Sequence, residues 1–328
     1  MTWLRSYLTI SACVLVAVAV APASTAQSSE GAVAAPAETK PAQPLRVAVI
    51  GASASAGFGC SLRENRDGET WSASFRLIDM VRLACPELDI LSTDMSSGFF
   101  FLAPVRNGAR AVQRAQEFRP DCVVALDFLF WYGYGDDGPE GKRLAAEDER
   151  LAKFELGLAE LAKFTVPVFV GDMPDMSPAV GRMLSRTQMP AVDTIARMND
   201  RLKEWAHGRA NVRVLPLSRM QAQLMADDSL DIAGARLEST AEKPLLQNDR
   251  LHPAPLGLAG LACAIAGELR MVCEKPDEGC EPEPEGTFER ARGELRRIAP
   301  RMPAAPKDAA KPSAPEKPAT PTAPTAAP

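Results

Sequence analysis

The sequence Leu45-Arg46-Val47-Ala48-Val49-Ile50-Gly51-Ala52-Ser53-Ala54-Ser55-Ala56-Gly57 is an apolar, β-branched run that ends in a turn of small residues. Such a run is typical of a strand buried on both faces of a parallel sheet. Comparable runs follow at residues 88–91, 122–126, 166–170 and 212–217. Helical patterns accompany them at residues 70–83, 105–117, 144–164, 192–206 and 255–271. This alternation predicts an α/β fold with a five-stranded, doubly wound parallel sheet and right-handed crossovers.

The composition of the 328-residue chain is ordinary for a soluble globular protein, with 46% apolar and 24% charged residues. The net charge is -5, and the Lys and Arg residues are scattered along the chain. We therefore expect no nucleic-acid partner, because no basic cluster is available for a phosphate backbone. His207 and His252 are the chain's two histidines, which makes a histidine-rich metal site hard to build. We expect neither a metal nor another cofactor.

Residues 1–26 have the pattern of a signal peptide. Arg5 supplies the positive start, residues 8–20 are apolar but too short to cross a bilayer, and small residues at 21–26 offer a cleavage site. An uncleaved anchor and a lipoprotein modified at Cys13 are the alternatives. We expect a periplasmic or secreted protein with no stable membrane span after signal cleavage.

The rest of the chain divides by composition. Residues 27–44 and 301–328 are rich in Pro and Ala without hydrophobic periodicity, so we expect a disordered linker and a disordered tail that is free to contact the cell envelope. Between them we expect one domain over residues 45–272 and an acidic segment over residues 273–300. A short helix at residues 287–298 either packs on the domain or leads into the tail.

Export to an oxidising compartment would allow the cysteines to form disulfides. After loss of Cys13, an even number remains, which in an oxidising compartment favours up to three disulfides. These residues are Cys60, Cys85, Cys122, Cys263, Cys273 and Cys280. Cys273 and Cys280 bracket a short turn and are the easiest pair, whereas buried free thiols are the alternative for the other four.

Parallel sheets bind ligands outside the carboxyl ends of their strands. The turn from Gly51 to Gly57 directly follows the first predicted strand, and its small residues let the hydroxyl of Ser53 stand exposed near backbone N–H groups. Ser55 is a rival hydroxyl in the same turn. A phosphate-binding glycine loop is an alternative, although Gly-x-Gly-x-x-Gly requires glycine where Ser53 stands. Taken alone, the loop also fits an ordinary tight turn.

A second motif lies at residues 249–253, where Asp249-Arg250-Leu251-His252-Pro253 leads into the last apolar helix. The spacing lets Asp249 and His252 share one side of a short turn, so that the carboxylate can orient the imidazole. A histidine held in this way can act as general base for a serine hydroxyl. A histidine that packs beneath a helix is the alternative, and a structural role suits His207, which precedes Gly208 at a helix end.

Together the two motifs resemble those of the SGNH, or GDSL-type, hydrolase family, whose first block is Gly-Asp-Ser-x-x-x-Gly and whose last is Asp-x-x-His-Pro. The resemblance covers residues 45–272. It implies a three-layer α/β/α, flavodoxin-like fold and a serine hydrolase. In that hydrolase Ser53 is the nucleophile, His252 the base and Asp249 the residue that orients the base.

The family's oxyanion hole is matched in part. Gly98, in Ser96-Ser97-Gly98, stands where the family has an oxyanion-hole glycine, so the resemblance implies the N–H groups of Ser53 and Gly98 as donors. The family's third donor is the asparagine of Gly-x-Asn-Asp, and Leu129 stands at that position. Ala52 replaces the aspartate that precedes the family's nucleophile. The chain therefore resembles a variant that lacks the usual asparagine block.

Three further segments lie near the expected site. Trp131 and Tyr132 either supply a replacement donor, form a platform for a sugar or an acyl group, or belong to the core. Asp172 and Asp175, after the fourth strand, either line the substrate pocket or are solvated loop acids. The charged segment 136–150 is a solvated loop and helix start, or a lid.

Two functions follow. The first is an exported serine esterase that hydrolyses a small acyl or O-acetyl ester of a small molecule or glycan through an acyl-serine intermediate, with transfer to another alcohol also open. The second is a catalytically degenerate protein of the same fold that binds an envelope glycan or a protein partner.

Overall fold

The computed structural model describes residues 43–66, 69–144, 146–273 and 282–298. The expected signal peptide, nearly all of the expected linker and the expected tail lie outside the described residues. Cys280 lies outside them as well.

The centre of the fold is a parallel sheet of five strands in the order β4-β1-β5-β6-β7. The strands are β1 (Leu45–Val49), β4 (Ile90–Asp94), β5 (Cys122–Ala125), β6 (Val168–Gly171) and β7 (Val212–Leu215). Counted along the chain, the order is 2-1-3-4-5, which is the flavodoxin-like arrangement. The predicted α/β fold with a five-stranded parallel sheet is confirmed.

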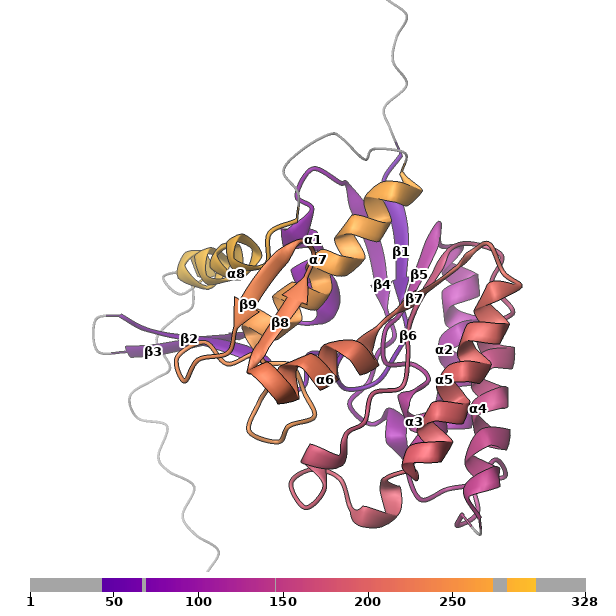
Figure 1. The fold of residues 1–328 in the computed structure, drawn as a ribbon. Helices are drawn as coiled ribbons and strands as arrows, with labels where there is room; N and C mark the ends of the chain where they lie inside the picture. Colours follow the sequence, from indigo (N-terminus) through magenta and orange to yellow (C-terminus); the bar gives the residue numbers. More distant parts are fainter. Residues whose placement is uncertain (1–42, 67–68, 145, 274–281, 299–328) are drawn as a thin grey trace, which may run out of the picture. The chain divides into compact units, whose positions relative to one another are not determined.

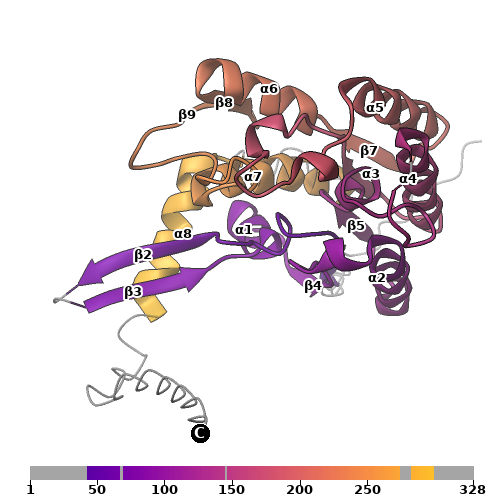
Figure 2. The same ribbon diagram turned by 90° about the horizontal axis from the view of Figure 1, so that it is seen from below.

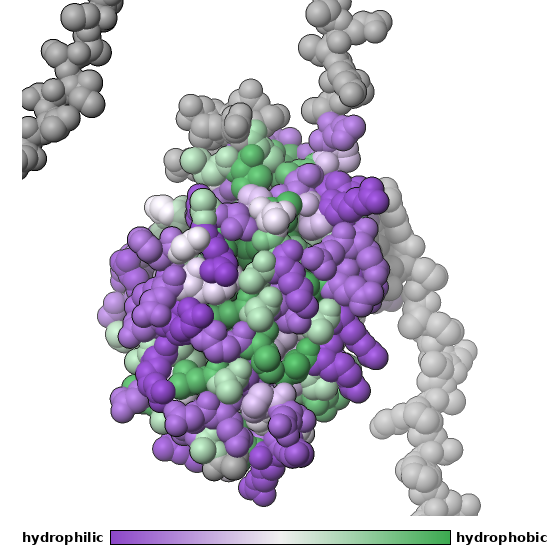
Figure 3. All heavy atoms as spheres, turned by 90° about the vertical axis from the view of Figure 1, so that its right-hand side faces the viewer, coloured by the Kyte–Doolittle hydropathy of each residue, from purple (hydrophilic) through white to green (hydrophobic). Residues whose placement is uncertain are grey.

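Helices cover both faces of this sheet (Figure 1). One layer contains α2 (Pro104–Phe118), α4 (Glu147–Leu161) and α5 (Val192–His207). The other contains α1 (Leu77–Ala84), α6 (Leu217–Asp227), α7 (Pro255–Val272) and α8 (Pro284–Ile298). Figure 3 views the molecule from the side of α2, α4 and α5, and much of the outer surface there is hydrophilic.

Each strand contributes to two hydrophobic cores because successive side chains point to opposite faces of a sheet. In β1, Val47 and Val49 join the core beneath α1 and α7, whereas Ala48 joins the core beneath α2 and α4. In β5, Val124 and Val123 divide in the same way. This alternation explains why the strands read as continuous apolar runs.

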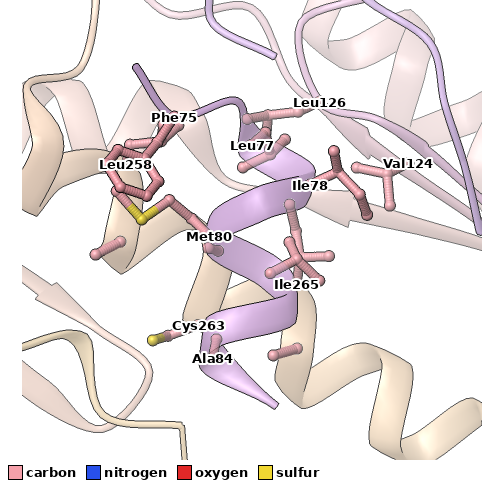
Figure 4. Close-up of a cluster of buried hydrophobic side chains, with 14 of the residues drawn as sticks. Phe75, Leu77, Ile78, Met80, Ala84, Val124, Leu126, Leu258, Cys263 and Ile265 are labelled. Atoms are coloured by element: carbon pink, nitrogen blue, oxygen red, sulfur yellow. The ribbon is translucent and has the colours of Figure 1, made fainter. Parts of the chain in front are cut away.

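The core on the α1 side is built where α1 lies against α7. Figure 4 shows Ile78 of α1 beside Val124 of the sheet, and Met80 beside Leu258 of α7. α8 packs on α1 and α7, and its Phe288 is buried in the same core. The helix expected near residues 287–298 is therefore part of the domain and does not simply lead into the tail.

Helix α7 is the one helix among the described residues that is long and apolar enough to cross a membrane, with a hydropathy of 1.4 over 18 residues. Most of it is buried inside the fold, and it packs against α1 and α8. Burial of this kind is what the central helix of a globular core requires.

Two hairpins and two helices were not expected from the sequence. β2 (Ser61–Arg66) pairs with β3 (Glu69–Ser74), and β8 (Ser229–Ile232) pairs with β9 (Ala235–Glu238). The β2–β3 hairpin projects from the body beside α8 (Figure 2), where Arg296 and Glu64 form an ion pair. The helix expected over residues 70–83 is therefore wrong for residues 70–76: helix begins at Leu77, and residues 69–74 form a strand in which more and less exposed positions alternate, as in an edge strand. The helices α3 (Phe130–Gly133) and α6 were also missed.

Four of the cysteines expected to form disulfides are unpaired. Cys60, Cys85, Cys122 and Cys263 are buried free thiols that pack in the core on the α1 side. Burial raises the pKa of the Cys60 thiol to about 12, which keeps it protonated and unreactive. The expectation of up to three disulfides is not met at these four residues, and the pairing of Cys273 with Cys280 lies outside the described residues.

Two helical glycines test how tightly the helix layers pack. A Cβ at Gly157 of α4 would lie 2.8 Å from Leu129 Cδ2 and 2.8 Å from Tyr132 Cγ, whereas a Cβ at Gly267 of α7 would meet nothing within 4 Å. We expect Gly157→Ala to lower the free energy of unfolding by about 1–3 kcal/mol through overpacking. Gly267→Ala should raise it by about 0.5–1 kcal/mol, because alanine favours the helix.

Chemical denaturation of the two variants and the wild-type protein measures both effects. Stabilisation by Gly157→Ala would contradict the close contact between α4 and the residues after β5.

Candidate active site

The candidate site lies at the carboxyl end of the sheet, between β1 and β5. The strand order reverses direction at this point, so the loops that leave β1 and β5 run to opposite sides and leave a crevice. Ser53 follows β1, and Asp127 follows β5, which is hydrogen-bonded to β1 along its length. Figure 1 shows α3 and α6 near this lower end of the sheet.

Ser53, His252 and Asp249 form a continuous hydrogen-bonded chain. Ser53 Oγ is 2.7 Å from His252 Nε2, and His252 Nδ1 is 2.7 Å from Asp249 Oδ2. The serine and the histidine are 199 positions apart in sequence, so the fold itself brings them together. The three residues named as candidate catalytic residues therefore meet in one place.

The turn at residues 249–252 builds the histidine's environment locally. Asp249 Oδ1 accepts hydrogen bonds from the backbone N–H groups of Leu251 at 2.9 Å and His252 at 3.0 Å, which leaves Oδ2 for the ring. Arg250 has a φ of 58°, the left-handed conformation that closes this turn. Burial by itself would raise the pKa of the Asp249 carboxyl, but the hydrogen bonds from His252 and Leu251 outweigh it and hold the pKa below its usual value. The carboxylate therefore stays charged next to the imidazole.

The histidine ring is shielded from solvent. His252 is buried, and the ring of Phe58 lies against it with centroids 4.6 Å apart. Phe58 itself is 46% exposed, so its outer face forms part of the surface above the site. Shielding of this kind strengthens the hydrogen bonds within the chain of three residues because it lowers the local dielectric constant.

Asp127 holds the serine turn in shape. Its carboxylate accepts hydrogen bonds from the N–H groups of Ala52 at 2.9 Å, Ala54 at 2.8 Å and Ser55 at 3.2 Å, and from the Ser55 hydroxyl at 2.6 Å. Ser55 is therefore committed to Asp127, while Ser53 faces His252. The structure thus places the rival hydroxyl away from the base.

Gly51 makes this contact possible. A Cβ at position 51 would lie 2.3 Å from Asp127 Oδ1 and 2.8 Å from Ser55 Oγ. A side chain there would push the carboxylate out of the turn. The glycine that opens the serine motif is required because of this close approach.

Gln247 ties the two motifs together. Its Nε2 donates to the Phe58 carbonyl at 2.7 Å and to the Pro253 carbonyl at 2.9 Å. One amide therefore fixes the end of the serine turn to the residue after His252. The distance between Ser53 and His252 depends on this bridge as well as on the sheet.

Gly98 lies beside the serine turn, as the oxyanion position requires. The N–H of Ser97 donates to the Gly51 carbonyl at 3.1 Å, and Phe58 is the side chain nearest to Gly98. Within the described residues, neither Gly98 nor Ser53 has a hydrogen-bond acceptor for its backbone N–H. No described group of the protein therefore occupies either N–H, which the role expected for the two as oxyanion donors requires.

The aromatic residues after β5 belong to the core and do not form a substrate platform. Leu129, Trp131 and Tyr132 are buried in the core beneath α2 and α4, with Leu129 and Tyr132 at 1% and 0% exposure. The Tyr132 hydroxyl has no hydrogen-bond partner and lies against Gly108 of α2. The expectation that Trp131 and Tyr132 line the pocket is therefore wrong, and Leu129 leaves the third donor position apolar.

A cavity of about 120 Å³ opens next to Ser53 and His252. It runs between the carboxyl end of the sheet, α6, β8 and the start of α7, and most of its lining is apolar. The apolar lining residues include Phe130, Met176, Leu217, Leu224, Leu230 and Leu261. An apolar cavity beside a hydroxyl nucleophile suits a hydrocarbon group next to the reacting carbonyl.

The two aspartates proposed for the pocket differ in their positions. Asp172 lines the cavity, and its carboxylate accepts hydrogen bonds from the backbone N–H and the hydroxyl of Ser218 at the start of α6. Burial raises the pKa of the Asp172 carboxyl, while the bonds from Ser218 act in the opposite direction. Asp175 is exposed and does not line the cavity. Asp172 thus anchors a pocket wall, and Asp175 is a solvated loop acid.

Sequence reasoning missed Asp127, Gln247 and the cavity wall formed by α6. A signal for Asp127 was present, because it directly follows a buried strand next to the one that carries Ser53. Gln247 gave no signal, since its contact with Phe58 spans 189 positions. The sequence predicts a strand over residues 212–217, but β7 ends at Leu215 and α6 begins at Leu217. The predicted strand therefore covered the start of the helix that forms this wall.

No family model and no curated protein match the chain, whereas several solved structures resemble it. A gut microbial diltiazem-metabolizing enzyme is 12% identical, with a TM-score of 0.41 over 71% of this chain and 47% of its own. A candidate acylhydrolase from Bacteroides fragilis is 14% identical, with a TM-score of 0.43 over 70% of this chain and 88% of its own. The esterase EstA from Pseudoalteromonas is 13% identical, with a TM-score of 0.36 over 70% of this chain and 97% of its own. The chain spans about half the length of the first of these enzymes.

The role of Asp127 can be tested by amide substitution. Asp127→Asn keeps the side chain's shape but replaces one carboxylate oxygen with an N–H₂ group, and because each oxygen accepts from two donors of the serine turn, two of the four donors lose their acceptor. We expect the free energy of unfolding to fall by about 1–3 kcal/mol. Asp175→Asn, at the exposed position, is the matched control and should change it by less than about 0.5 kcal/mol. Equal effects of the two substitutions in urea denaturation would show that Asp127 does not support the turn.

Proposed function

We propose that the protein is an exported serine ester hydrolase of the SGNH type that works through an acyl-serine intermediate. The proposal rests on one observation, the chain of hydrogen bonds from Ser53 through His252 to Asp249, with both contacts at 2.7 Å. A serine hydroxyl is a weak nucleophile until an adjacent base takes its proton, and this geometry supplies that base.

In the acylation step, Ser53 Oγ attacks the ester carbonyl carbon while His252 Nε2 takes the hydroxyl proton. The carbonyl oxygen gains negative charge and accepts hydrogen bonds from the N–H groups of Ser53 and Gly98. The intermediate collapses with cleavage of the bond to the alcohol, and His252 gives its proton to the departing oxygen. Asp249 stabilises the imidazolium that exists between these events.

Deacylation repeats the sequence with water. His252 takes a proton from the water as its oxygen attacks the acyl carbon, and the acid leaves when Ser53 recovers its proton from His252. Another alcohol in place of the water gives acyl transfer by the same route. The substrate is an ester of a small molecule or a glycan, met in the periplasm or outside the cell.

Leu129 supports a second candidate function. A leucine side chain cannot donate a hydrogen bond, and loss of one oxyanion donor can reduce the rate of a serine hydrolase by about 10²–10³. A protein that keeps the fold but has lost catalysis would bind a glycan or partner of the cell envelope. The open N–H groups of Ser53 and Gly98 favour the enzyme, because they leave two donors in place.

Covalent labelling with a fluorophosphonate separates the two candidates. We expect the wild-type protein to be labelled, Ser53→Ala to give no label and His252→Ala to be labelled at least about 10³-fold more slowly, because the base activates the nucleophile. Ser55→Ala should still be labelled. Ser177→Ala, at an exposed position, is the control for serine replacement. A folded wild-type protein that resists the probe and hydrolyses no p-nitrophenyl ester would favour the binding role.

A further inference from the structure

The cavity beside Ser53 contains one polar side chain that is not engaged by another part of the protein. Five polar residues line it among the residues that the structure describes, namely Ser53, Asp127, Asp172, Gln221 and His252. Ser53 and His252 bind each other, Asp127 holds the serine turn, and Asp172 binds Ser218. Gln221 alone is left for a ligand.

The amide of Gln221 is buried without a partner. The residue is 8% exposed, and its Nε2 has no hydrogen-bond acceptor in the structure. An unpaired buried N–H group costs free energy, and one beside a cavity, unlike the Tyr132 hydroxyl in the core, can be completed by a bound molecule. Because the other polar residues that line the cavity are bound to one another or to the serine turn and α6, an acceptor atom on a bound molecule would be the group that completes it.

The position of Gln221 on α6 is that of a core residue. Leu217, Gln221 and Leu224 share one face of the helix at spacings of four and three, and all three line the cavity. On this face a leucine or methionine would fill the space without leaving a donor unpaired. The polar residue therefore interrupts an apolar wall at a single point.

We propose that the acyl group of the substrate is a hydrocarbon chain that carries one hydrogen-bond-accepting oxygen, a keto or hydroxyl group, which binds Gln221 Nε2. This inference rests on the proposed function, since Ser53 must hold the carbonyl end of the chain. The apolar lining contacts the hydrocarbon chain. The Gln221 amide favours chains whose oxygen lies at the right distance from the ester carbonyl to reach it. A site built to bind an oxygen discriminates against chains that lack it, because the donor then stays unpaired.

The test compares p-nitrophenyl octanoate with p-nitrophenyl oxo-octanoates whose keto oxygen stands at successive carbons beyond the third. For the wild-type protein we expect one oxo isomer to be hydrolysed with a kcat/KM about tenfold above that of octanoate. Gln221→Leu should abolish this preference and raise kcat/KM for octanoate, because leucine completes the apolar wall. Gln223→Leu, on the same helix but outside the cavity lining, should retain the wild-type preference.

Binding to Ser53→Ala separates this inference from the proposed function. Isothermal titration with the free acids should show about tenfold tighter binding of the preferred oxo-octanoic acid than of octanoic acid, and Gln221→Leu in the same background should remove the difference. Ester hydrolysis that depends on Ser53 but ranks all chains alike overturns the role of Gln221 and leaves the esterase intact. If no ester is hydrolysed, the esterase proposal fails, and equal binding of the two acids then overturns the acyl site as well.

Discussion

The site depends on the contact between Asp127 and the turn that follows β1. Four donors of that turn converge on one carboxylate, and this is possible because β1 and β5 are neighbours and end at the same edge of the sheet. With the turn fixed, the hydroxyl of Ser53 faces His252. The parallel sheet and the Asp127 contacts thus fix the turn that carries the nucleophile, and the Gln247 bridge fixes that turn to the residue after His252.

Asp127 also explains how the chain accommodates Ala52. In the family that the motifs resemble, an aspartate at this position supports the serine turn from within; here the carboxylate of Asp127, which follows the adjacent strand β5, supports it from outside. Gly51 leaves room for that carboxylate, since a Cβ would lie 2.3 Å from Asp127 Oδ1. The residue that supports the turn is thus close to it in space but distant in sequence. Departure from a motif at one residue therefore need not change the geometry that the motif serves.

The parts of this fold that could be predicted from the sequence are those with local signals. The five strands are continuous apolar runs, and Asp249 to His252 is a turn whose contacts lie within four residues. Trp131 and Tyr132 were ambiguous because aromatic residues serve cores and binding sites equally, and only the packing of α2 and α4 decides between these roles. Gln247 could not be found, because its partner Phe58 lies 189 positions away. The helix predicted over residues 70–83 overlaps β3, although Asp67-Gly68 just before that strand is a typical hairpin turn sequence.

The oxyanion site and the cavity are linked in the proposed reaction. With Leu129 in the core, stabilisation of the oxyanion depends on the N–H groups of Ser53 and Gly98, so the substrate carbonyl has to be held accurately between them. Binding energy from a part of the substrate that does not react can provide that orientation. The cavity beside Ser53 is also lined by residues of α6, β8 and α7, and the acyl chain proposed to bind there would provide such a contact. An acyl chain anchored along this cavity would have less freedom to rotate its carbonyl away from the two donors, and a small acetyl group would lack that anchor.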